Sequence, residues 1–461
     1  MTIEQLHTKR TVLLVSALSS LLVPFISSSI NIALPTITNE LRMSAVAMGW
    51  VPTAFLLSAA VFLVPLGKVA DMYGRKRLFL WGMVILTISS LMAVVAGSAW
   101  LLIISRVIQG IGAAMIFGTS IAILTSVYPE GERGFALGIT IGAVYIGLSL
   151  GPFVGGFLTE HVGWRSIFVV NIPVCLLVIG VTLFGLKGEW AEGRRASYDF
   201  GGAIIYGLAL VGIMYGFSLL PSPYGLLSIL VGICGGVAFI CWEKRVPDPL
   251  LNIDLFENNR VFLFSNLAAF VNYGATFAVA FLLSLYLQYI KGMSAQTAGI
   301  ILVTQPAVQA LFSPLAGRLS DRVEPRVVAS AGMAVTVVGL FICSLFTYHT
   351  PLPLIVAALA ALGFGFALFS SPNTNAIMGS VNRRFYGIAS GMVATMRLMG
   401  QMLSMGVTVL VFALYLGSAR ISEQHYPLFL KSAQTIFICF ACLCLIGVAT
   451  SLYRGNLRQR Q

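Results

Sequence analysis

Two arginines lie inside long apolar stretches of this 461-residue chain. Arg106 occurs in the segment RVIQGIGAA, three residues before Gln109, and Arg397 occurs in MRLMGQ. A cation at bilayer depth costs about 2.5–3.5 kcal/mol on insertion scales, so such residues commonly serve binding or coupling. All 16 acidic residues fall outside the apolar stretches. The sequence therefore predicts a cationic site inside the membrane without a carboxylate at the same depth.

The residue types and their spacing do not support nucleotide hydrolysis, nucleophilic catalysis or metal binding. The sequence contains no phosphate-binding Walker loop, no Gly-x-Ser-x-Gly nucleophile turn and no His-Glu-x-x-His zinc motif. The seven cysteines lie in apolar stretches, and the closely spaced Cys439, Cys442 and Cys444 have no His, Asp or Glu in the same stretch. Thiols in such surroundings act as small apolar side chains. We expect no enzyme activity, no metal site and no cofactor.

The elements that hold these residues follow from composition. The chain is 58% hydrophobic and 10% charged, which is typical of a membrane protein that crosses the bilayer many times. Apolar segments near the length of about 20 residues that crosses a bilayer as a helix recur from end to end. The predicted spans are Thr11–Leu34, Met48–Leu66, Leu78–Gly97, Leu101–Val127, Phe135–Leu158, Ser166–Leu186, Gly201–Leu220, Leu226–Trp242, Val261–Leu285, Ala298–Leu315, Val327–Phe346, Leu352–Met378, Gly387–Leu416 and Phe429–Tyr453.

The distribution of Lys and Arg predicts the orientation. With both termini in the cytoplasm, most of the 28 basic residues fall on the cytoplasmic side. Only Arg42, Arg165, Lys291, Arg420 and Lys431 fall on the outer side. This asymmetry follows the positive-inside rule and predicts a multi-pass protein of the plasma or inner membrane. The net charge of +12 then reflects topology and contact with anionic lipid, and we expect no nucleic-acid partner.

The chain repeats itself after about 250 residues. GKVADMYGRKR, at Gly67–Arg77, follows the second span, and GRLSDRVEPR, at Gly317–Arg326, follows the tenth. Both segments place an Asp four residues after a Gly, followed by basic residues. The duplication predicts an all-α fold of about 14 transmembrane helices, with a six-helix half at 1–190, two additional helices at 191–250 and a second six-helix half at 251–461.

Several motifs together resemble the major facilitator superfamily. The first turn is similar to that family's G-x-L-A-D-R-x-G-R-K pattern, with Met72 where a base is usual. RVIQGIGAA resembles its second motif, and GLSLGPFVGGFL, at Gly147–Leu158, resembles a motif associated with antiporters. Trp164–Pro173, Glu243–Phe256 and Tyr286–Gly299 further resemble the fourteen-helix drug/proton antiporter branch.

The resemblance implies a conformational latch at the two repeated turns. Asp71 would engage the start of the thirteenth span near Arg383, Arg384 and Gly387, across the two halves. The alternative is a basic turn that only fixes topology. The candidate latch residues are Gly67, Asp71, Gly74, Arg75, Lys76, Gly317, Asp321 and Arg322.

In the fifth span, Gly147, Gly151 and Gly155 form a bare stripe at four-residue spacing, beside Pro152 and Gly156. Such a stripe predicts close helix packing. The resemblance further implies a role in preventing leak and supporting exchange, and a packing seam without functional tuning is the alternative.

Transport and coupling are assigned to Arg106, Gln109 and Arg397. For Arg106 the alternative is an anchor that snorkels to the outer headgroups, and for Arg397 it is a structural bond to backbone carbonyls or polar neighbours. Relatives frequently carry an acid five residues before the Asn of N-x-A-L-P. Here NIALP begins at Asn31 and the acid position is Ile26, which weakens the case for proton coupling.

Uncharged polar residues in the spans are candidates for lining a central cavity: Ser28, Asn31, Asn272, Tyr273, Gln305, Gln309, Asn373 and Asn375. We expect a secondary transporter that works by alternating access and exports small amphipathic compounds, with protons as the coupled ion. Transport of a specific organic anion or metabolite, without proton coupling, is the alternative, because the intramembrane charges are arginines. A receptor or scaffold is a third class, which absence of any substrate flux would favour.

Overall fold

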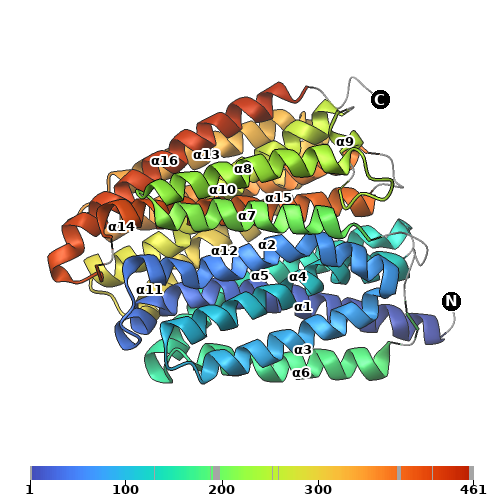
Figure 1. The fold of residues 1–461 in the computed structure, drawn as a ribbon, viewed down its shortest axis with the longest axis horizontal. Coiled ribbons are helices and arrows are strands. Elements are labelled where there is room, and N and C mark those ends of the chain that lie inside the picture. The colour runs from blue at the N-terminus through green and yellow to red at the C-terminus, as the bar shows by residue number, and fades with distance from the viewer. Residues whose placement is uncertain are drawn as a thin grey trace. The chain divides into compact units, whose positions relative to one another are not determined.

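The computed structural model describes residues 3–128, 130–186, 188–189, 198–251, 253–257, 259–381, 386–417 and 419–455. Within these residues, 14 helices are long and apolar enough to cross a membrane, as the sequence predicts. Helices dominate the chain, and the described part contains no strand (Figure 1). The protein is an all-α membrane protein.

The helices follow the predicted spans but extend beyond most of them. Those of the first half are α1 (Ile3–Glu40), α2 (Ala45–Tyr73), α3 (Arg75–Val94), α4 (Ala99–Val127), α5 (Glu130–His161) and α6 (Ser166–Gly185). The two additional helices are α7 (Phe200–Leu219) and α8 (Pro223–Glu243). The rest are α9 (Asp254–Glu257), α10 (Arg260–Leu285), the π-helix η1 (Tyr286–Ile290), α11 (Ala295–Leu302), α12 (Thr304–Arg322), α13 (Pro325–Ser344), α14 (Leu352–Gly379), α15 (Tyr386–Tyr415), the short 3₁₀ helix η3 (Glu423–His425) and α16 (Tyr426–Tyr453).

Local sequence explains several helix boundaries. The Ser98 side chain accepts a hydrogen bond from the Leu101 amide at the start of α4, and Asn259 accepts one from the Phe262 amide at the start of α10. Such side-chain acceptors satisfy amides that have no partner in the first helical turn. Between α11 and α12 the backbone stays helical at Val303, with φ −60° and ψ −24°. Pro306 lacks the amide that would bond Leu302, so the tenth predicted span is divided there.

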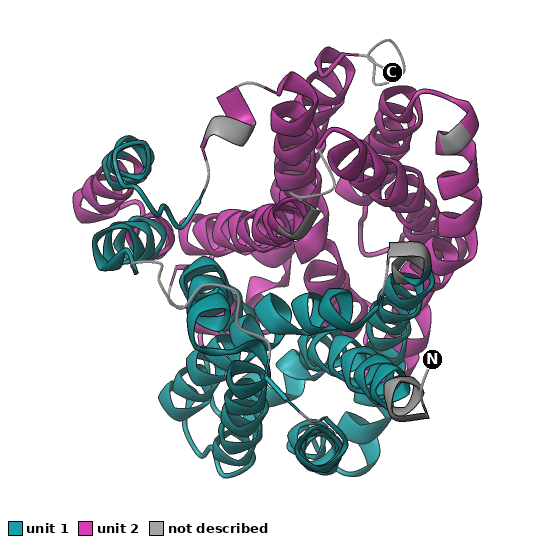
Figure 2. Ribbon diagram, turned by 90° about the vertical axis from the view of Figure 1, so that its right-hand side faces the viewer, with its two compact units in different colours: residues 1–43, 50–211, 234–251 teal, residues 44–49, 212–233, 252–461 magenta. Residues whose placement is uncertain are grey.

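The chain forms two compact units (Figure 2). Unit 1 contains Met1–Met43, Trp50–Val211 and Cys234–Leu251. Unit 2 contains Ser44–Gly49, Gly212–Ile233 and Asn252–Gln461. Residues of the α7–α8 hairpin therefore fall into both units, whereas the six helices that precede the hairpin and those that follow it fall almost entirely into one unit each.

The sequence duplication recurs in how helices pack within each unit. In unit 1, α1 packs on α5 and α3 packs on α4 and α6; in unit 2, α10 packs on α15 and α13 packs on α14 and α16. A glycine lies where α4 crosses α2 in unit 1, and another lies where α14 crosses α12 in unit 2. A Cβ added at Gly110 of α4 would lie 2.3 Å from the Phe55 carbonyl oxygen, and one added at Gly363 of α14 would lie 2.3 Å from that of Gln305. Small residues let helix backbones approach this closely, so the two units share one packing scheme.

Candidate functional site

Arg106 of α4 is completely buried inside unit 1. Its Nη1 donates a hydrogen bond to Gln109 Oε1, and its Nε donates one to the Val51 carbonyl oxygen at 3.3 Å. The guanidinium lies over the Phe55 ring, 4.5 Å from the centroid. These contacts turn the side chain toward α2 and the interior of its unit. The alternative of an arginine that snorkels to headgroups therefore does not fit this position.

One donor of this buried guanidinium remains available. Among the described residues, Arg106 Nη2 has no hydrogen-bond partner. Gln109 donates from Nε2 to Ser90 Oγ at 3.1 Å, so the chain Arg106–Gln109–Ser90 joins α4 to α3. A buried donor without a partner is costly, and a polar group of a bound solute or a water molecule would satisfy it.

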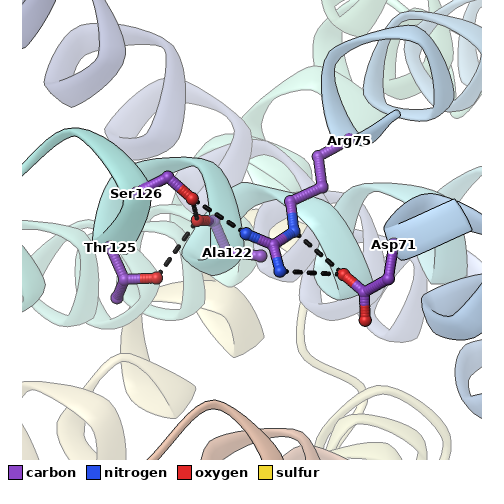
Figure 3. Close-up of polar contacts among 5 residues, drawn as sticks. All are labelled: Asp71, Arg75, Ala122, Thr125 and Ser126. Carbon is purple, nitrogen blue, oxygen red and sulfur yellow. Dashed lines mark hydrogen bonds and ion pairs between the residues drawn. The ribbon is translucent and has the colours of Figure 1, made fainter. Parts of the chain in front are cut away.

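The turn between α2 and α3 brings Asp71, Arg75 and Ser126 together (Figure 3). Asp71 Oδ1 accepts hydrogen bonds from Arg75 Nε and Nη2, both at 2.9 Å. Arg75 Nη1 donates to Ser126 Oγ near the end of α4 at 2.8 Å, and Ser126 Oγ donates to the Ala122 carbonyl oxygen. The predicted latch residues Asp71 and Arg75 thus form a network within unit 1. Arg383 and Arg384 lie outside the described residues, and contact of Asp71 with the other half stays a prediction.

Glu189 joins this turn, although no motif in the sequence indicates it. The Lys76 amide donates to Glu189 Oε1 at 2.7 Å, and the Arg77 amide donates to Oε2 at 3.2 Å. A carboxylate is stabilised at a helix N-terminus, here that of α3, by the exposed amides and the helix dipole. Gly74 has φ 117°, a backbone conformation that residues with a side chain rarely adopt, and an added Cβ would displace the Glu189 carboxyl, whose Cδ would lie 2.5 Å away. Lys76 Nζ also donates to the Leu186 carbonyl oxygen.

The second repeated turn is less fully described. Gly317 lies on α12, where an added Cβ would lie 3.1 Å from Ser371 Oγ of α14. Arg322 is exposed at the end of α12. The Asp321 side chain lies outside the described residues.

The glycine stripe of α5 packs directly on α1. Added Cβ atoms at Gly147, Gly151 and Gly155 would lie 2.3 Å from the Leu21 carbonyl oxygen, 1.8 Å from Ser28 Oγ and 2.9 Å from Ser29 Cα. Pro152 lies inside the helix, and Pro152 and Gly156 are buried beside the stripe. The seam predicted from the spacing is therefore present, with Ser28 placed in it.

The remaining cavity candidates separate into two groups. Asn375 Nδ2 donates to Ser320 Oγ at 2.9 Å, and Tyr273 packs edge-on against Phe366, so both join neighbouring helices of unit 2. Asn272 is completely buried on α10, and within the described structure its amide oxygen and nitrogen both lack hydrogen-bond partners. Gln309 Nε2 is likewise buried without a described partner. Asn272 and Gln309 therefore carry polar atoms that a solute or water would satisfy.

The cavity candidates Asn31 and Gln305 and the coupling candidate Arg397 lie on three different helices. Asn31 is buried on α1, Gln305 is half-buried on α12, and Arg397 is half-buried on α15.

Arg454 is buried, although its sequence position had suggested only a cytoplasmic basic residue. Nη1 donates to Asn373 Oδ1 at 2.8 Å and to Ser265 Oγ at 3.2 Å, while Asn373 Nδ2 donates to the Ser265 carbonyl oxygen at 3.0 Å. Burial lowers the pKa of Arg454 to about 10, so it keeps its charge at neutral pH. The cluster joins α10, α14 and the end of α16.

Glu40 and Arg165 form a second cluster that sequence alone did not pair. Arg165 Nη1 donates to Glu40 Oε1 at 2.6 Å, and Trp164 Nε1 donates to Oε2 at 2.7 Å. Arg165 also donates to the carbonyl oxygens of Val94 and Ala96. Glu40 therefore ties the end of α1 to the start of α6, and Arg165 ties both to the end of α3.

The fold and these sites define a polytopic carrier built from two repeated units. The family model described as Major Facilitator Superfamily matches residues 16–241 and 266–460. The chain belongs to the major facilitator superfamily, whose members are transporters rather than enzymes.

Curated relatives cover most of the chain. The riboflavin transporter RibZ of Clostridioides difficile is 28% identical over 92% of this chain and 93% of its own length. The multidrug resistance protein Stp of Mycobacterium tuberculosis is 30% identical over 86% of this chain and 74% of its own. A crystal structure of a D-xylose–proton symporter aligns with a TM-score of 0.69 at 14% identity, covering 97% of both chains, which supports the fold.

Proposed function

We propose that this protein exports small amphipathic compounds across the cell membrane by alternating access, in exchange for protons. The observation that carries the proposal is the 30% identity to a multidrug resistance protein over 86% of this chain, and the buried Arg106 of the membrane-spanning helix α4 supplies a polar donor without a described partner. The similarity of this chain to the multidrug resistance protein supports export, rather than uptake, of small amphipathic compounds. The lipid bilayer is both the surroundings of the carrier and the source of lipophilic substrates.

The charge of the site favours particular substrates. Arg106 repels further positive charge in a low-dielectric interior, and Ile26 is completely buried where relatives of the antiporter branch often carry an acid. Neutral or monovalent compounds are therefore preferred over divalent lipophilic cations. Within unit 2, considered by itself, Asn272 and Gln309 have buried polar atoms without a described partner that could bind an uncharged polar group.

A specific organic anion or metabolite is the second candidate substrate. Arg106 suits a carboxylate or another anionic group, and the similarity to a riboflavin transporter supports a carrier with a narrow substrate range. In that case transport need not be coupled to protons.

Uptake of matched monovalent and divalent dyes into everted membrane vesicles, which corresponds to export from the cell, tests the first proposal. We expect pH-gradient-driven transport of the monovalent dye and little of the divalent one. A parallel thermal-shift screen with neutral drugs, lipophilic cations and organic anions identifies the bound class, because ligands stabilise the state they bind. Stabilisation by anions alone, with flux that ignores the pH gradient, would favour the second candidate. Equal export of both dyes would contradict the charge argument.

A further inference from the structure

Two buried acids face each other at one end of the α7–α8 hairpin. Asp199 directly precedes α7 and Glu243 is the last residue of α8, and the two residues are 8% and 3% exposed. Both residues belong to unit 1. Buried carboxylates are rarely found without a partner, so this pair needs an explanation separate from the Arg106 site.

Backbone amides and the Trp242 indole donate hydrogen bonds to Asp199 and to Glu243 Oε2. Asp199 Oδ1 accepts a hydrogen bond from the Gly202 amide at 2.8 Å, and Trp242 Nε1 lies 3.1 Å from both Asp199 oxygens. Glu243 Oε2 accepts a hydrogen bond from the Leu251 amide at 2.8 Å. The Leu250 amide also acts on the Glu243 carboxyl, so each acid has two uncharged donors nearby.

Asp199 Oδ2 and Glu243 Oε1 both lie beside Gly202 and border one small space. A Cβ added at Gly202 would lie 2.2 Å from Asp199 Oδ2 and 2.6 Å from Glu243 Oε1. Glu243 Oε1 is buried and, within the described part of the chain, has no hydrogen-bond donor. Two adjacent buried carboxylates repel strongly when both are ionised, because burial weakens the screening of their charges.

We propose that Asp199 and Glu243 together bind one proton. The proton is carried by Glu243 Oε1 and donated in a hydrogen bond to Asp199 Oδ2, so the pair holds a single negative charge. This bond satisfies the unpartnered oxygen and joins the beginning of α7 to the end of α8. The proton is taken from water and returned to it, and the site exists whether or not export is proton-coupled.

The surrounding groups fit a proton better than a metal cation. Asp199 is the charged group that acts on the Glu243 carboxyl; Tyr198 precedes Asp199, Lys244 and Arg245 are exposed after Glu243, and Asp248 is half-buried in the next connection. A bound Ca²⁺ takes about six to eight oxygen ligands, whereas a shared proton needs only two. No group of three metal-ligating side chains occurs among the residues that the structure describes.

Infrared spectroscopy of the purified full-length protein tests the proposal directly. At neutral pH we expect the carbonyl band of a protonated carboxylic acid, which disappears in Glu243→Gln. That substitution keeps an N–H donor toward Asp199, so the hairpin should still fold. Glu257→Gln, which changes an exposed acid in the following connection, is the matched control and should leave the band unchanged.

The pH dependence of thermal stability is a second, independent measurement. The melting temperature of the wild type should fall as pH rises from about 4 towards neutrality and level off above it, because the unfolded carboxyls ionise in that range while the folded pair still holds its shared proton. Glu243→Gln should flatten this dependence, and Glu257→Gln should not. An unchanged acid band in Glu243→Gln, no acid band in the wild type, or a site that responds to Na⁺ but not to pH would overturn the proposal. None of these results depends on export activity.

Discussion

Gly147 of α5 faces the carbonyl oxygen of Leu21 on α1 so closely that an added Cβ would lie only 2.3 Å from that oxygen. The neighbour is backbone rather than a movable side chain, so no rotamer change relieves the contact. The seam between these helices therefore depends on the absence of a side chain at this position.

Gly147→Ala should lower the free energy of unfolding by about 1–3 kcal/mol, the usual cost of overpacking a tight contact. Export should fall as well, because α1 and α5 would be pushed apart. Gly142→Ala is the matched control on the same helix, where an added Cβ meets nothing within 4 Å. Thermal unfolding and dye export of both variants measure the effect. Equal melting temperatures for the two variants would contradict the close approach.

Arg106→Lys should reduce export about tenfold or more, although the positive charge is kept, since a loss of about 1.4 kcal/mol already corresponds to tenfold. The planar guanidinium reaches Gln109, Val51 and Phe55 at once, and an ammonium does not. Gln109 or the Val51 carbonyl would lose its donor, at a cost of about 1–3 kcal/mol. Transport rates and melting temperatures of the two proteins provide the measurement. Wild-type rates in the lysine variant would show that charge alone matters here.

Asp71→Asn should cut transport while leaving membrane insertion and ligand-induced stabilisation intact. The substitution removes the charge that pairs with Arg75, whereas the bond from Arg75 to Ser126 can persist. Glu132→Gln is the control, because it breaks the Lys9–Glu132 ion pair, whose acid is 51% exposed. Exposed pairs contribute little, about 0–1 kcal/mol. Unchanged transport in Asp71→Asn would reduce this turn to a topology signal.

Arg454→Leu and Asn373→Leu should be coupled in a double-mutant cycle of unfolding. The two side chains share a hydrogen bond at 2.8 Å, so we expect an interaction energy of about 0.5–3 kcal/mol. Asn375→Leu should instead be additive with Arg454→Leu, because Asn375 bonds to Ser320. Additive effects in the first pair would rule out the buried cluster.

The predicted orientation is tested by labelling cysteines in intact cells, in a background without the exposed Cys234, Cys241, Cys439 and Cys442. Gly188→Cys and Gly455→Cys should resist an impermeant reagent applied from outside. Gly163→Cys, at the opposite end of its unit's helices, should react. Labelling of either of the first two sites would overturn the proposed topology.

The sequence by itself determined the number of spans, the duplication and the seam. Hydropathy depends on about 20 consecutive residues, so helices such as α4 and α14 are identified from local composition alone. The spacing of Gly147, Gly151 and Gly155 depends only on helical periodicity, which is why the seam could be predicted before its partner α1 was known. The repeated turns at Gly67 and Gly317 similarly revealed the duplication.

Only the tertiary structure decided which polar residues pair. Arg454 and Glu243 stand at helix ends, where hydropathy gives the same signal for a solvated charge and for a buried one. Asp199 meets Glu243, Glu40 meets Arg165 and Arg454 meets Asn373 because of how the helices rotate and pack, and no local pattern encodes these distant contacts. The same packing places Asn373 in a structural bond and leaves the amide of Asn272 without a described partner, a distinction that residue type alone cannot make.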